Sequence, residues 1–189
     1  MREISLHLLD IAENSVAAGA SSISIGVEED YHKDLLAASV IDNGKGMDPD
    51  TAEKVMDPFF TSRTTRNVGL GIPLFKAAAE ACDGQLNIFS TPGIGTTITI
   101  TFKLSHIDRM PLGDLSSTFL SLLIAYPKIH WTFLYKVYSN DQADSGKEFF
   151  FDDTEVKNEL QDVSLCDPEI LKYFRQIFET GILETKITQ

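Results

Sequence analysis

The order of helical and strand-like hydrophobic patterns along the first hundred residues is the feature that most constrains the fold of this chain. Apolar residues recur at three- and four-residue spacing from Ile4 to Val16, which predicts a helix that ends at Gly19. Residues 22–28 alternate between polar and apolar, as a half-buried strand does. Residues 35–41 form an apolar run that is typical of a buried strand.

The following segments complete this pattern. A short helix is expected over residues 48–56, and a further helix runs from Gly71 to about Gly84. Two strands follow at residues 85–90 and 96–104, joined by a turn. The order predicts a two-layer α/β (α+β) sandwich in which helices cover one face of a mixed β-sheet.

The pattern changes after residue 104. The elements expected there are a helix from Asp114 to Tyr126, a hairpin of strands at 129–138 and 148–151, and a final helix over 169–179. We therefore expect two domains, residues 1–104 and a small α+β domain of residues 105–189 whose role the sequence does not indicate. The aromatic residues of the second part predict either a core of its own or a protein interface. They are Phe119, Trp131, Phe133, Tyr135, Phe149, Phe150 and Phe151.

Composition excludes several kinds of partner. A formal net charge of -12 argues against nonspecific binding to nucleic acid or to an anionic membrane. No stretch approaches the roughly 20 apolar residues of a membrane span, and the start of the chain carries no signal-peptide pattern. Cys82 and Cys166 lack metal-ligand spacing, so we expect reduced thiols in a cytoplasmic protein. An acidic chain that binds a polyanion must use backbone amides, helix N-termini or a metal ion.

Asp10 and Asn14 are four residues apart and therefore share one face of the first helix. An amide oxygen is a suitable ligand for Mg²⁺, which prefers hard oxygen donors. A carboxylate one turn away can orient or deprotonate an attacking water or hydroxyl group. The alternative is a polar helix face in solvent.

Asp42 to Met47 (DNGKGM) follows the buried strand of residues 35–41. Its glycines let the backbone turn sharply and approach a ligand. A carboxylate fixed there can accept a hydrogen bond from an exocyclic amine such as that of adenine, and Met47 can pack on the base. The alternative is an ordinary turn.

Two further glycine segments lie downstream. Gly69-Leu70-Gly71 opens a helix after a loop that carries Arg63, an arrangement whose free amides and positive helix end favour anions. This pattern is weak alone, and the P-loop motif is absent. Gly93 to Thr96 forms a tight turn into a strand, and the alternative for this segment is a simple hairpin.

Five segments resemble, in this order, the motifs of the GHKL ATPase superfamily. Its members include sensor histidine kinases, anti-sigma-factor kinases, MutL proteins and gyrase B. The segments are ENSVAAGAS, DNGKGM, DPFFTSR, GLGIPL and GIGTTITITF, within about residues 4–103. The first resembles the MutL version, whereas residues 59–102 resemble the histidine-kinase version. The resemblance implies the Bergerat ATP-binding fold, with ATP and Mg²⁺ as cofactors.

The resemblance also implies roles for individual residues. Asn14 would bind Mg²⁺, Asp42 would bind the adenine amine, Gly44, Gly46 and Met47 would shape the base pocket, and Thr96 would support Asp42. Gly69, Leu70 and Gly71 would contact phosphates beneath a lid of about residues 57–68 that carries Arg63. Asp10 stands where hydrolysing members place a general-base Glu, and its side chain is one methylene shorter.

These observations predict a cytoplasmic Mg-ATP-binding protein, a kinase or slow ATPase with Asp10 as its base. It would act on or through a protein partner, or associate with itself, through residues 105–189. The alternative is a nucleotide-gated regulatory module of the anti-sigma type with little or no turnover. His7 lies on the same helix face as Asp10 and Asn14, and is either a group near the triphosphate or a histidine packed against the sheet.

Overall fold

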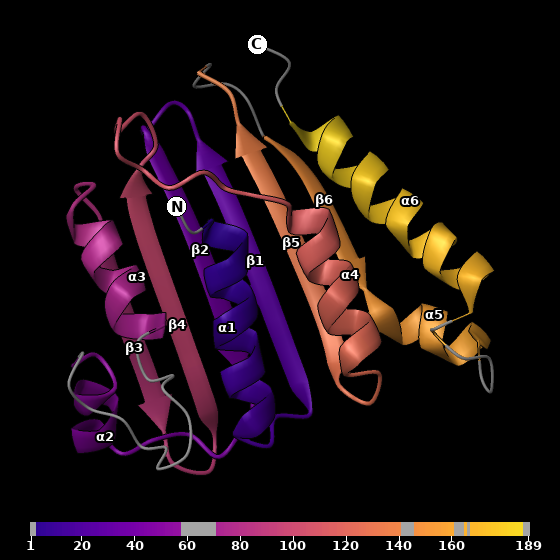
Figure 1. Cartoon of the computed structure of the whole chain (residues 1–189), viewed down its shortest axis with the longest axis horizontal. Coiled ribbons are helices and arrows are strands. Elements are labelled where there is room, and N and C mark those ends of the chain that lie inside the picture. The colour runs from indigo at the N-terminus through magenta and orange to yellow at the C-terminus, as the bar shows by residue number, and fades with distance from the viewer. Residues whose placement is uncertain (1–2, 58–70, 141–145, 161–164, 166, 187–189) are drawn as a thin grey trace.

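A computed structural model describes residues 3–57, 71–140, 146–160, 165 and 167–186. The strands are β1 Ser22–Asp30, β2 Leu35–Asp42, β3 Gln85–Thr91, β4 Gly95–Lys103, β5 His130–Tyr138 and β6 Lys147–Asp152. The helices are α1 Ile4–Ala17, α2 Pro49–Lys54, α3 Gly71–Glu80, α4 Leu115–Ala125, α5 Asp153–Leu160 and α6 Pro168–Thr185. The strands form one six-stranded sheet in the order β3-β4-β2-β1-β5-β6 (Figure 1).

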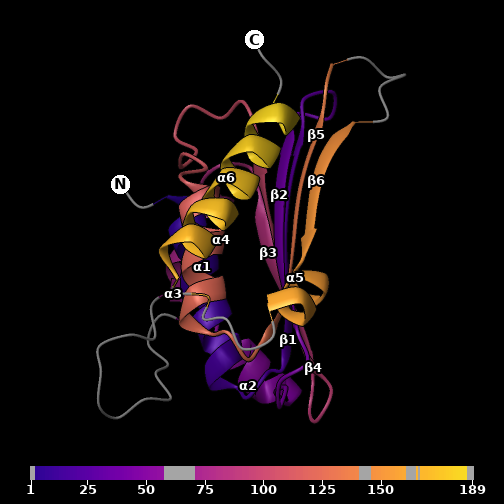
Figure 2. The same ribbon diagram turned by 90° about the vertical axis from the view of Figure 1, so that its right-hand side faces the viewer.

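Four helices cover one face of this sheet. Seen edge-on, the sheet forms one layer, and α1, α3, α4 and α6 lie together on one side of it (Figure 2). The predicted sandwich of a mixed sheet with helices on one face is therefore confirmed. Each strand begins and ends within two residues of its predicted bounds.

Two helices differ from the prediction. α5 follows β6 directly and was not predicted, because its sequence DTEVKNEL has no apolar stripe. α6 continues through Gly181 to Thr185, beyond the predicted end at residue 179. A Cβ on Gly181 would collide with the ring of Phe149, so this glycine permits close packing of the helix and does not end it.

The pairing of β1 with β5 gives the sheet its mixed character. β1 is antiparallel to β2 on one side and parallel to β5 on the other, in register from Ser22 opposite His130 to Asp30 opposite Tyr138. The Tyr135 hydroxyl donates a hydrogen bond of 2.5 Å to the Glu29 carboxylate across this pair. Burial is the main cause that raises the pKa of Tyr135, and the Glu29 hydrogen bond adds to it. Strands from residues 105–189 thus continue the sheet of the first hundred residues.

The core lies between the sheet and its helices, and its buried side chains form one continuous cluster. Most of the aromatic residues noted in the second part belong to it. Phe119 stacks on Phe133 with 4.4 Å between ring centroids, and Phe151 meets Phe178 at 4.8 Å. Phe150, by contrast, is 59% exposed. Most of these rings are therefore buried, but in a core that they share with the rest of the sheet and not in a separate core of their own.

The thiol of Cys82 is buried, and this burial is the main reason that its pKa is raised. Cys166 lies outside the described residues. Among the helices that the structure describes, none is long and apolar enough to cross a membrane.

Candidate functional site

Helix α1 supplies three polar side chains in two turns. Asp10 is half-buried, Asn14 is exposed, and Ser15 is buried at 5% exposure. The helix packs its apolar stripe on the sheet, so these residues lie along the border between its buried and exposed faces. α1 therefore forms one wall of a polar cluster.

Asp42 lies opposite this wall, at the end of β2. The Ser15 hydroxyl donates a hydrogen bond of 2.6 Å to Asp42 Oδ2, and the Gly44 amide donates one of 2.8 Å to Asp42 Oδ1. A carboxylate has about four lone-pair sites, so two remain for another donor. The two bonds fix the orientation of the carboxylate, and the residue is still partly exposed.

The loop after Asp42 is held against the segment that joins α1 to β1. Asn43 accepts hydrogen bonds from the amides of Ser21 and Ser22 at 2.9 Å each. The Lys45 amide donates to the Ala18 carbonyl at 3.0 Å. A Cβ on Gly44 would lie 3.1 Å from the side chain of Ala18, which explains a glycine at this position.

The same loop also contacts the β3–β4 turn. Gly46 has a φ of 65°, and a Cβ there would collide with the Thr91 carbonyl. The Ser90 hydroxyl accepts a hydrogen bond of 2.8 Å from the Met47 amide and lies 2.9 Å from the Thr96 hydroxyl. Thr96 is the register partner of Asp42 across β2 and β4. Asp42, Met47 and Thr96 are thereby brought to one end of the sheet.

The start of α3 lies close to Asp10 on α1. A Cβ placed on Gly71 would lie 3.8 Å from Asp10 Oδ2, so the backbone of the last predicted glycine passes close to the Asp10 carboxylate. The structure thus brings Gly71 to the cluster. Arg63, Gly69 and Leu70 lie outside the described residues.

A groove of about 600 Å³ lies between α2 and α3. The described residues that line it are Asp50, Glu53, Lys54, Met56, Asp57 and Lys76. The described lining includes none of the predicted site residues, and three of its side chains are acidic.

Two serines of the cluster were missed from the sequence. Ser15 ends the apolar stripe of Ile4, Leu8 and Ile11, and a hydroxyl at a buried stripe position needs a hydrogen-bond partner. That signal could have indicated a contact such as the one with Asp42. Ser90 is an ordinary strand serine with no such signal, because its partners come from two other segments.

His7 belongs to the core. It is 3% exposed and its ring stacks on Phe75, with centroids 4.4 Å apart and planes 6° from parallel. Of the two alternatives, the packed histidine describes its position, although the ring that it stacks on belongs to α3 and not to the sheet.

Several curated proteins are similar to the first part of the chain. "Sensor protein kinase FleS" of Pseudomonas aeruginosa is 41% identical over 51% of this chain and 24% of its own length. "Non-motile and phage-resistance protein" of Caulobacter vibrioides is 32% identical over 57% of this chain and 14% of its own length. "Signal transduction histidine-protein kinase AtoS" of Escherichia coli is 33% identical over 52% of this chain and 16% of its own length. The chain thus spans less than a quarter of the length of these relatives.

The fold also resembles that of a solved structure. The N-terminal domain of a DNA repair protein superposes with a TM-score of 0.55 at 15% identity, over 79% of this chain and 52% of that chain. The shared fold therefore extends past the segment in which the kinases are similar. Residues 2–106 match the family described as "Histidine kinase-, DNA gyrase B-, and HSP90-like ATPase". Because this match covers more than half of the chain, the protein belongs to that family of ATPases.

Proposed function

We propose that this chain binds ATP with Mg²⁺ between α1, the Asp42 loop and the start of α3. We further propose that it is a kinase or slow ATPase that acts on or through a protein partner. Residues 1–104 would hold the nucleotide, and residues 105–189 would govern contact with the partner. Domains of this family bind ATP.

One observation carries the proposal: the Asp42 carboxylate is fixed from two sides, yet the residue remains partly exposed. A preoriented acceptor at the end of a buried strand suits an exocyclic amine, because no side-chain entropy is lost when the base binds. An amine is the donor that distinguishes adenine from guanine at this edge of the base. Met47, whose amide is bonded to Ser90, follows in the same loop and would offer an apolar contact to the ring.

The remaining polar groups suit a metal–triphosphate. The exposed Asn14 amide can contribute one oxygen to Mg²⁺, which usually keeps several waters and binds phosphate oxygens besides. The N-terminus of α3, a helix of 10 residues, presents backbone amides and a positive dipole end at Gly71. An acidic chain with a formal charge of -12 would hold a polyanion by these local means.

Asp10 would act on the nucleophile. Its carboxylate lies beside Gly71, one helical turn before Asn14, where it can accept a proton from water or from a hydroxyl group. Positioning and charge stabilisation would supply most of the rate enhancement, as in other phosphoryl transfers.

Calorimetry on Asp42→Asn tests the nucleotide site. The amide removes one acceptor and leaves polar groups unmatched, so ATP affinity should fall by about 1–3 kcal/mol, roughly ten- to a hundredfold. Preference for ATP over GTP should disappear with it. Asp34→Asn, at the other end of β2, is the matched control and should bind ATP normally. Unchanged affinity in Asp42→Asn would rule out this role.

The rival function is a nucleotide-gated module without turnover. The side chain of Asp10 favours it, because it is one methylene shorter than the Glu of hydrolysing members and reaches less far toward the nucleophile. A turnover assay on Asp10→Asn and Asp10→Glu separates the two. If the chain is a catalyst, Asn should abolish phosphate release or transfer, whereas Glu should retain it, and both should bind ATP. Equal rates for the wild type and Asp10→Asn would favour the gated module.

A further inference from the structure

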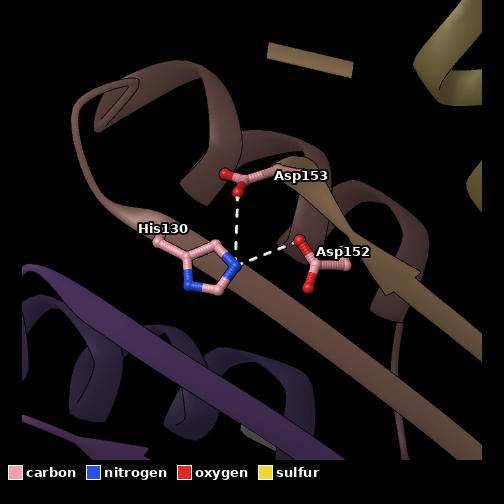
Figure 3. A group of neighbouring side chains, drawn as sticks. All are labelled: His130, Asp152 and Asp153. Carbon is pink, nitrogen blue, oxygen red and sulfur yellow. Dashed lines mark hydrogen bonds and ion pairs between the residues drawn. The ribbon is translucent and has the colours of Figure 1, made fainter. Parts of the chain in front are cut away.

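A group of three metal-ligating side chains lies outside the proposed nucleotide site. His130 begins β5, Asp152 ends β6 and Asp153 begins α5, and their side chains converge at one end of the sheet (Figure 3). Their ligand atoms all lie within 4.8 Å of one another. His130 Nε2 is 3.0 Å from Asp152 Oδ1 and 3.9 Å from Asp153 Oδ1.

Asp153 is the unusual member of this group, because its side chain is only 1% exposed. Its Oδ2 forms an ion pair with the ammonium group of Lys157. Among the described residues, no donor makes a hydrogen bond to its Oδ1, which is directed toward His130. A buried carboxylate oxygen without a hydrogen bond is costly unless a cation compensates it.

The imidazole of His130 can complete such a site. Its Nδ1 lies 3.2 Å from the Ser22 hydroxyl, which can accept the Nδ1 proton. In that tautomer the lone pair of Nε2 points at the two carboxylates. Three electron-rich atoms then face one another, and Lys157 neutralises only one of the two negative charges. A cation between them would neutralise the remaining negative charge.

We propose that His130, Asp152 and Asp153 bind a zinc ion or a chemically similar divalent transition-metal ion. Zinc bonds of about 2.0–2.2 Å to nitrogen and oxygen place tetrahedral ligand atoms roughly 3.4 Å apart. The two distances from Nε2, 3.0 and 3.9 Å, lie on either side of this value. An imidazole ligand favours zinc, nickel or cobalt over Mg²⁺ or Ca²⁺.

The surroundings of the ligands support this assignment. The Thr154 amide donates a hydrogen bond of 2.8 Å to Asp152, and Ser22 orients the imidazole, as outer-shell groups do in metal sites. The side chains of His130 and Asp152 are 41% and 39% exposed, so a fourth coordination position would open to solvent. The site does not involve Asn14 or Asp42, and is distinct from the Mg²⁺ site proposed above.

Titration of the chelator-stripped full chain with Zn²⁺ alone tests the proposal, with calorimetry and the visible bands of Co²⁺ as readouts. We expect one equivalent to bind, and the Co²⁺ spectrum to show a nitrogen ligand. His130→Gln should weaken binding by about tenfold or more. His32→Gln, an exposed histidine on the β1–β2 turn, should bind as the wild type does.

Two further variants separate loss of this site from loss of the fold and from metal binding at Asn14. Asp152→Asn, which is half exposed and should keep the fold, must also lose affinity, and circular dichroism confirms that it is folded. Asn14→Ala must retain zinc binding, because no nucleotide is present. If the wild type takes up no zinc, or if His130→Gln binds it as tightly as the wild type, the metal site is refuted.

Discussion

Beneath α1 and α3 the buried layer is mainly aliphatic, whereas beneath α4 and α6 it consists largely of stacked rings. Ile4, Leu8, Ile23, Leu36 and Val40 represent the first region, and Phe119, Phe133, Phe151, Phe174 and Phe178 the second. Every described residue of the proposed nucleotide site comes from the first region. The aromatic region contributes none of them, but it covers β1 and completes the sheet. The residues of the proposed nucleotide site therefore lie in one part of the core, and much of the aromatic packing lies in the other.

Removing a ring from the aromatic region tests whether the two regions unfold together. Phe178→Ala should cost about 3–5 kcal/mol of unfolding free energy, because Phe178 is fully buried among several rings. Urea unfolding followed by the fluorescence of Trp131, the single tryptophan, reports on this region. Circular dichroism reports on both regions, and the two transitions should coincide. Tyr173→Ala, on the same helix and 55% exposed, is the control. Separate transitions would show that the regions are independent.

Loss of the hydrogen bond between Tyr135 on β5 and Glu29 on β1, where the two regions meet, should have the next largest effect on stability. Tyr135→Phe leaves Glu29 without its 2.5 Å partner in a buried setting and should cost about 1–3 kcal/mol. Tyr31→Phe is a matched control, because the Tyr31 hydroxyl reaches the same carboxylate at 3.4 Å from a half-exposed position. The free energy of unfolding measured by chemical denaturation should therefore be clearly lower for Tyr135→Phe than for Tyr31→Phe. The reverse order would mean that this hydrogen bond does not stabilise the pairing of β1 with β5.

The helix caps of the two regions give the smallest effects. Asp114 caps α4 by accepting from the Ser117 amide at 2.9 Å, and Asp114→Ala should cost about 0.5–2 kcal/mol. Asp48 caps α2 in the same way through Thr51, but α2 has no buried residue, so Asp48→Ala should cost less. Thermal melts of the two variants give the ranking. A larger loss in Asp48→Ala would contradict it.

Acid should abolish the Asp114 effect. The hydrogen bonds from Ser117 lower the pKa of Asp114 in the folded protein. A lowered pKa means that the cap stabilises the protein above the unfolded pKa of about 3.9, and that this contribution is lost as the pH falls through the folded value. The gap between wild type and Asp114→Ala should therefore be constant near neutral pH and shrink below about pH 4.

The sequence predicted the strands well, because period-2 patterns and turn residues are local signals. It also predicted that a buried strand runs up to Asp42 and that a helix begins at Asp114. It missed α5, whose residues are polar, and it ended α6 too early at residue 179, although the helix continues through Gly181, which is needed for packing. Local patterns do not distinguish a terminal glycine from one that lies under a ring.

The contacts of the site were less accessible to sequence analysis. The order of the glycine segments placed Asp42, Gly44 and Thr96, but the bonds from Ser15 and Ser90 depend on how α1 and β3 meet the loop. The group of His130, Asp152 and Asp153 gave no signal, because His130 and Asp152 are 22 residues apart without a metal-binding spacing. Only the β5–β6 pairing brings them together.

The parallel pairing of β1 with β5 also determines when the molecule can finish folding. Ser22 and His130 are 108 positions apart, so the ribosome must make most of the chain before β1 meets its second neighbour. Until then one side of β1 has open amides and carbonyls, which can pair with a strand of another nascent chain. Contacts between such distant residues also form slowly. Changes that delay the docking of β5 should therefore reduce the yield of native protein more than its affinity for nucleotide.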